Sequence, residues 1–111
     1  MKIVNRKEFL KLPAGIVFAK YKPCIFGKLA IKESSIDCES INDFIVQPLG
    51  VEIDADFDEF VGKCKKAENG EEVPLNYDCF ERYGFFHQDQ LFAVFSKEDV
   101  KKLIDRLIET L

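Results

Sequence analysis

The last fifth of the chain constrains the fold more than any other part. Residues 91–95 are apolar on both faces of a strand, as expected where both faces of a sheet are covered. Ser96 follows as a helix N-cap, with Glu98 and Asp99 in the first turn. Apolar residues then recur along one helical stripe: Val100, Leu103, Ile104, Leu107, Ile108 and Leu111. The sequence therefore predicts a central strand followed by an amphipathic helix, about residues 97–110, packed on the sheet.

The preceding residues predict further strands and a middle helix. Segments rich in β-branched and aromatic residues, bounded by Pro and Gly, indicate strands at 16–21, 29–32, 43–49, 50–53 and 77–83. Asp56 with Glu59 is typical of a helix start, and Asn69-Gly70 of a helix end, which predicts a helix at about 56–68. At 111 residues the chain has the length of one domain. We therefore expect one α+β domain, residues 1–111, with a mostly antiparallel sheet of four to six strands.

Composition narrows the class of protein. Eleven Phe and no Trp favour a Phe-rich core, because Phe has no polar atom to satisfy. No apolar run reaches the ~20 residues of a membrane span, and the basic start lacks the apolar stretch of a signal peptide. We expect a cytoplasmic protein that does not enter a membrane, with its four Cys as buried thiols.

Charge is divided along the chain. Residues 1–33 carry eight Lys and Arg against Glu8 and Glu33, whereas residues 34–96 carry fourteen Asp and Glu against four basic residues. A division of this size favours oriented encounter with a partner. The partner expected from it is another protein, with self-association as an alternative.

An acidic run is the first candidate site, and its residues are Glu52, Asp54, Asp56, Asp58 and Glu59. The three aspartates match positions 1, 3 and 5 of a calcium loop. The loop then needs Gly at position 6 and Glu at position 12, where this chain has Glu59 and Lys65. A weaker carboxylate site for Mg²⁺ or Mn²⁺ stays open, and so does a strand end followed by a helix start, where acids are common.

The second candidate group surrounds His87, the one histidine, and includes Glu81, Arg82 and Asp89. Imidazole titrates near neutrality and can act as a general acid or base. No nucleotide-binding, hydrolase or zinc-protease motif accompanies it, so we assign no catalytic residue, metal ligand or cofactor.

Basic residues alternate with aromatic ones near the start of the chain. Lys20, Lys22, Lys28 and Lys32 lie among Phe18, Tyr21 and Phe26, an arrangement that can hold single-stranded nucleic acid. The net charge of −4 argues against a phosphate-rich partner, and the strand pattern turns several of these aromatics toward a core. The lysines are expected to face solvent.

Two stretches carry a resemblance. They are Phe9-Leu10-Lys11-Leu12-Pro13-Ala14-Gly15-Ile16-Val17-Phe18 and Arg82-Tyr83-Gly84-Phe85 with the residues from Asp89 to Val100. Both resemble small uncharacterised proteins of phage and prophage origin, which implies an accessory or host-interaction role. The sequence thus favours a non-enzymatic protein-interaction module. The alternative is a small enzyme or metal-dependent protein that uses Asp54, Asp56 and Asp58, or Glu81, His87 and Asp89.

Overall fold

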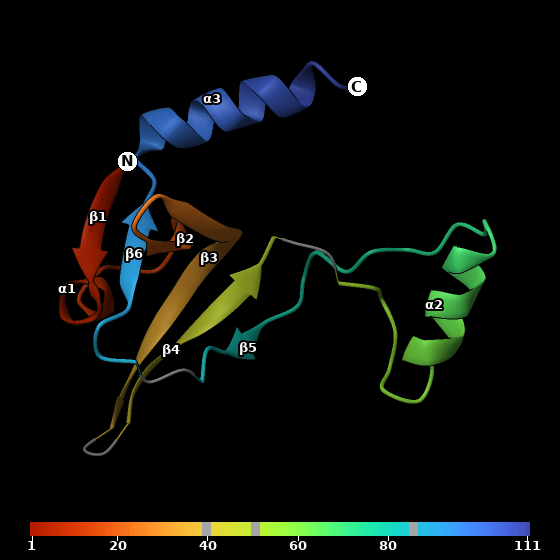
Figure 1. Ribbon diagram of the computed structural model, residues 1–111, viewed down its shortest axis with the longest axis horizontal. Coiled ribbons are helices and arrows are strands. Elements are labelled where there is room, and N and C mark those ends of the chain that lie inside the picture. Colours follow the sequence, from red (N-terminus) through yellow and green to blue (C-terminus); the bar gives the residue numbers. More distant parts are fainter. Residues whose placement is uncertain (39–40, 50–51, 85–86) are drawn as a thin grey trace.

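The computed structural model describes residues 1–38, 41–49, 52–84 and 87–111. Six strands form one sheet in the order β1-β6-β2-β3-β4-β5, and the neighbouring strands are antiparallel (Figure 1). The elements follow the chain as β1 (Lys2–Asn5), α1 (Arg6–Leu10), β2 (Ile16–Lys22), β3 (Ile25–Cys38), β4 (Ile41–Pro48), α2 (Phe60–Glu68), β5 (Glu81–Arg82), β6 (Leu91–Val94) and α3 (Lys97–Ile108). The predicted α+β fold with an antiparallel sheet is confirmed.

The core lies between one face of the sheet and the short helix α1. Asn5 begins α1 by accepting a hydrogen bond from the Glu8 N–H at 2.9 Å. Phe9 then projects from α1 into the sheet, where its ring stacks on Phe92 at 4.1 Å between centroids. It also meets Phe18 edge-on at 4.7 Å and Phe44 at 5.0 Å. These four buried rings hold the helix to the sheet.

The strands differ from the prediction in several places. β3 spans 14 residues instead of the expected four, because the register shifts between Lys32 and Ser35 and breaks the alternation that marks a strand. β1 was not predicted, since its four residues run directly into α1. Of the strand expected at 50–53, residues 50–51 lie outside the described part, and Ile53 forms an isolated bridge with Leu75.

The strand at the end of the chain is interior, as predicted, and lies between β1 and β2. The N-cap is also confirmed. Ser96 and Asp99 exchange hydrogen bonds, 3.0 Å to the Ser96 N–H and 3.1 Å to the Asp99 N–H. The packing of this helix on the sheet was not predicted correctly. α3 leaves the end of the sheet after a two-residue connection, and Ile104, Leu107 and Ile108 remain about half exposed.

Several Phe residues also differ from expectation. Of the nine Phe in the described part of the chain, only Phe9, Phe18, Phe44 and Phe92 are buried. Phe26, Phe57, Phe60 and Phe80 are exposed, because Phe26 lies at the hairpin end of β3 and the others lie in a segment that projects from the sheet. Cys24 is an exposed thiol in that hairpin turn, contrary to the expectation of buried cysteines. In the described residues, every helix is too short or too polar to cross a membrane.

Candidate functional site

An arm, which we define as residues 52–80, projects from the sheet between β4 and β5 and carries α2 (Figure 1). Its two ends run side by side. The Asp54 N–H donates to the Pro74 carbonyl at 3.0 Å, and the Asn76 N–H donates to the Glu52 carbonyl at 2.7 Å. Within the described residues, α1 packs on the sheet, whereas α2 forms no comparable contact with it. Two neighbouring segments of the chain therefore form a narrow neck at the base of the arm, and this neck holds α2 away from the core.

The acidic candidates lie on this arm. Glu52 is half-buried at the neck, whereas Asp54, Asp56, Asp58 and Glu59 are exposed along the segment that leads into α2. The helix begins at Phe60 and not at Asp56, because residues 57–59 form a turn in which Asp56 O accepts the Glu59 and Phe60 N–H groups. Among the described residues, no three His, Cys, Asp or Glu side chains gather at metal-binding distance. Glu59 lies 3.5 Å from the Lys63 ammonium, whereas Asp54, Asp56 and Asp58 present their charge to solvent.

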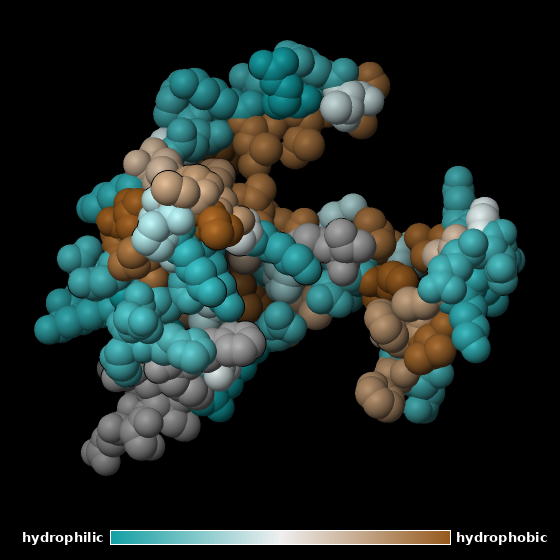
Figure 2. All heavy atoms as spheres, in the orientation of Figure 1, coloured by the Kyte–Doolittle hydropathy of each residue, from teal (hydrophilic) through white to brown (hydrophobic). Residues whose placement is uncertain are grey.

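An apolar patch adjoins these acids. We call Phe57, Phe60 and Val61 the arm patch, and their exposed fractions are 96%, 46% and 61%. Phe57 lies in the turn before α2, three and four residues ahead of Phe60 and Val61, and Figure 2 shows apolar atoms gathered on one side of α2 with polar atoms on the other. In the sequence these residues recur at helical spacing, but this periodicity gives no sign that the sheet leaves the apolar face uncovered.

The basic and acidic parts of the chain meet at the base of the arm. A cavity of about 280 Å³ is lined there by Lys20 and Lys28 together with Glu52 and Glu81. The Lys20 ammonium lies 4.8 Å from the centre of the Tyr83 ring. Burial, with the nearby Lys22 charge, lowers the pKa of Lys20. Beyond this base, the acids of the arm are held away from the basic strands.

The His87 group is spread over two places. His87 and Asp89 are exposed and line a cavity of about 640 Å³ with Tyr21 and Lys22, whereas Glu81 lines the cavity at the base of the arm. Arg82 is directed elsewhere, because its Nε donates to Asp43 Oδ2 at 2.7 Å. The structure therefore does not bring Glu81, His87 and Asp89 into one cavity.

A buried carboxylate was missed by the sequence analysis. Asp43 is fully buried, and its Oδ2 also accepts the Gly84 N–H at 2.9 Å, while Oδ1 lies 3.9 Å from the buried Arg6 guanidinium. Burial alone would raise the pKa of Asp43, but hydrogen bonds from Arg82 and from the Phe44 and Gly84 N–H groups outweigh it and lower the pKa. This carboxylate joins β4 to α1 and β5. A single Asp within a strand gives no signal of such a role.

Lys32 also differs from expectation, since it is buried and does not face solvent. Its ammonium donates to the Leu12 carbonyl and lies 5.6 Å from the centre of the Phe9 ring. Burial lowers the pKa of Lys32. These partners lie in α1 and in the loop after it, about twenty residues away in sequence, so strand alternation alone could not reveal them.

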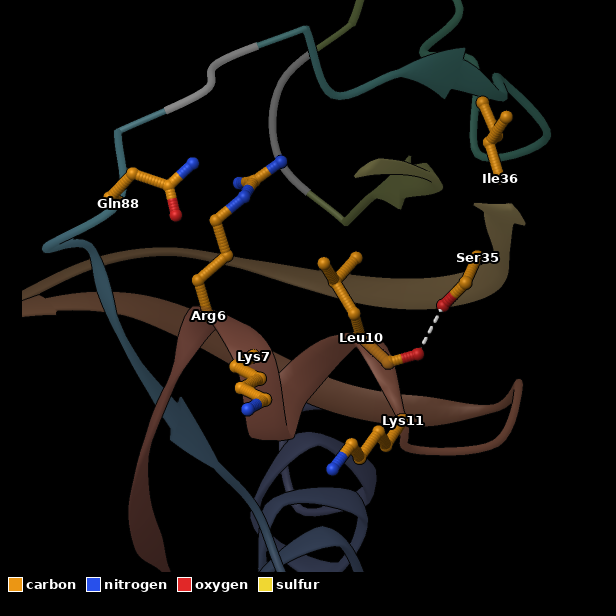
Figure 3. A pocket seen from close by; sticks show the side chains of 7 residues that line it. All are labelled: Arg6, Lys7, Leu10, Lys11, Ser35, Ile36 and Gln88. Atoms are coloured by element: carbon orange, nitrogen blue, oxygen red, sulfur yellow. Dashed lines mark hydrogen bonds between the residues drawn. The ribbon is translucent and has the colours of Figure 1, made fainter. Parts of the chain in front are cut away.

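A basic cavity of about 520 Å³ borders α1 and is shown in Figure 3. It is lined by Arg6, Lys7 and Lys11 with Ser35 and Gln88, and the Ser35 hydroxyl donates to the Leu10 carbonyl at 2.5 Å. The side chains of Lys7 and Lys11 point away from Arg6, whose charge faces Asp43. The three cations therefore do not converge on one anion site.

Comparison of the chain with protein-family models, with curated proteins and with solved structures gave no match. The candidate surfaces must therefore be judged on their own geometry.

Proposed function

We propose that this protein is a non-enzymatic interaction module that binds a protein partner through the arm. The observation that carries the proposal is the arm patch. Phe57 is 96% exposed, on a segment held away from the core and bordered by the acids Asp54, Asp56 and Asp58. Exposed aromatic side chains beside charge are typical of protein interfaces, where they fill pockets of the partner.

Charge indicates the chemistry of the partner. The arm carries nine Asp and Glu against three Lys, a net charge of −6. A surface of this kind attracts a basic protein and raises the rate of encounter. The partner we propose therefore presents Lys and Arg around an apolar recess that accepts Phe57 and Phe60. The acids would govern the association rate, and the aromatic rings would govern the dissociation rate.

The proposal predicts a defined salt dependence. Tagged protein captures partners from a lysate, and only those lost when both Phe57→Ala and Phe60→Ala are present are purified. For such a partner, the association rate should fall at least tenfold between about 50 and 500 mM salt, because screening shortens the reach of the charges. Surface plasmon resonance with the purified pair measures this rate.

Two pairs of charge substitutions distinguish the effect of the arm on the association rate from the effect of the rest of the surface. The pair Asp56→Asn and Asp58→Asn should slow association several-fold, whereas Glu98→Gln with Glu109→Gln removes the same charge from α3 and should not. All four residues are exposed, so both variants should fold, which circular dichroism checks. Equal rates in both variants, or an association rate indifferent to salt, would contradict the proposal.

A further inference from the structure

The apolar stripe of α3 is uncovered along most of its length. Val100 and Leu103 are partly buried near the start of the helix, whereas Ile104, Leu107 and Ile108 are 48%, 58% and 58% exposed. Figure 2 shows apolar atoms on the side of α3 that is turned back toward the sheet across a gap. No described segment of the chain packs into this gap against α3 in the way that α1 packs on the sheet.

The sheet beside α3 has a second apolar face. Ile3, Val17, Ile31 and Phe95 alternate with core residues along their strands, so they point away from α1, and all remain partly exposed. Phe95 is next to Ser96, the residue at which α3 begins. Two apolar surfaces, an exposed one on a helix and a partly exposed one on a sheet, therefore adjoin the same connection.

The exposed area is large enough for a stable interface. The chain exposes 8306 Å², whereas a compact monomer of 12.8 kDa exposes roughly 6,300 Å². The radius of gyration is 16.1 Å, against about 13 Å for a compact domain of this length. The excess of roughly 2,000 Å² is shared by the arm and α3, and a standard interface needs about 800 Å² from each partner. The exposed stripe of α3 can supply a substantial part of this area.

The charge balance of α3 favours a second copy of α3 as the partner that covers the stripe. Residues 97–111 carry four basic and four acidic side chains, so two such helices meet without net repulsion, unlike two arms of net charge −6. Lys101 and Asp105 lie one helical turn apart on one border of the stripe. When two α3 helices pack antiparallel about a two-fold axis near Leu103, Lys101 of each copy comes level with Asp105 of the other.

We propose that the protein forms a two-fold symmetric homodimer in which the α3 stripes of two copies pack antiparallel. The partner helix packs on the exposed side of the α3 stripe, with its own stripe turned toward it. This interface is separate from the arm, so a failure of the arm proposal leaves it unaffected.

Analytical ultracentrifugation of the full chain over a dilution series tests the dimer. We expect a reversible monomer–dimer equilibrium, and Leu107→Asp should weaken dimerisation at least 100-fold, because it places a charge in an apolar interface. Leu107 is exposed in the single chain, so the variant should keep its fold by circular dichroism. A chain that stays monomeric up to about 1 mM, or a dimer indifferent to Leu107→Asp, overturns the proposal.

Charge-reversal variants test whether the helix that covers the stripe is α3 of a second copy. Lys101→Glu and Asp105→Lys should each weaken dimerisation about tenfold, because each sets like charges against each other at two symmetry-related places. Mixing the two variants should restore dimerisation, since every cross-helix pair in the mixed dimer is again opposite in charge. Changes within one helix cannot produce this recovery. No recovery on mixing overturns the antiparallel pairing.

Lys102→Glu is the matched control. It reverses the same charge one residue further along, about 100° round the helix and on the side away from the stripe. The proposed dimer therefore predicts no change in its dissociation constant. A loss equal to that of Lys101→Glu would show that net charge, not the stripe, governs association, and would also overturn the proposal.

Discussion

Replacing Phe9 by alanine is expected to lower the free energy of unfolding by about 3–5 kcal/mol. Phe9 is fully buried and is the α1 side chain that stacks on Phe92 at 4.1 Å and meets Phe18 and Phe44 edge-on. Alanine leaves a cavity among three rings that strands β2, β4 and β6 hold in place. It also releases α1, whose five residues are too few to be stable as an isolated helix.

Urea unfolding at one fixed protein concentration measures this loss, with circular dichroism as the signal. Phe57→Ala is the control, because it removes the same ring from a position that is 96% exposed and should change stability by no more than about 0.5 kcal/mol. Two variants of equal stability, or a loss below about 1 kcal/mol for Phe9→Ala, would contradict the described core.

Asp43→Asn is the second change with a large expected effect, a loss of about 3 kcal/mol. The carboxylate is fully buried, accepts Arg82 Nε at 2.7 Å and faces Arg6, whose side chain is 4% exposed. Asparagine has nearly the same shape but no charge, so the Arg6 cation would remain buried beside a neutral amide. Asp89→Asn, at an exposed carboxylate, is the control and should be nearly neutral.

The same carboxylate gives stability a defined pH dependence. The pKa of Asp43 in the folded protein is lower than its ordinary value, so between the two values the unfolded chain binds more protons. The stabilisation is therefore complete above about pH 4, near the pKa of an unfolded Asp, and is lost as the pH falls through the folded pKa. Urea midpoints from pH 7 down to pH 2.5 should fall less steeply for Asp43→Asn than for the parent. Parallel profiles would mean that Asp43 titrates normally.

Local signals in the sequence were accurate where a few neighbouring residues determine the outcome. Ser96 caps α3 as predicted, because a cap depends on hydrogen bonds within one turn. The strand at 91–95 was located to within one residue by its continuous apolar run. The extent of β3 was not predicted, since a register shift between Lys32 and Ser35 hides the alternation. The start of α2 was placed four residues early, because Asp56 and Glu59 also suit the turn that precedes it.

The charge and apolar patterns of the candidate site were visible in the sequence, but their placement was not. The acids at 52–59 were identified, and the structure sets them beside Phe57 and Phe60 on an arm held away from the sheet. Asp43 and Arg6 were overlooked, because their contact joins residues 37 positions apart and leaves no local pattern.

The sequence by itself determined the type of most of the main elements, the cap of α3, and the division of charge along the chain. The tertiary structure alone decided which apolar faces are covered. An amphipathic helix has the same periodicity whether its stripe meets its own sheet, a second copy or another protein, because periodicity records only that a face is apolar. Whether an apolar face is buried depends on segments that are distant in the chain. In this protein α1 buries one face of the sheet, while the stripe of α3 stays exposed.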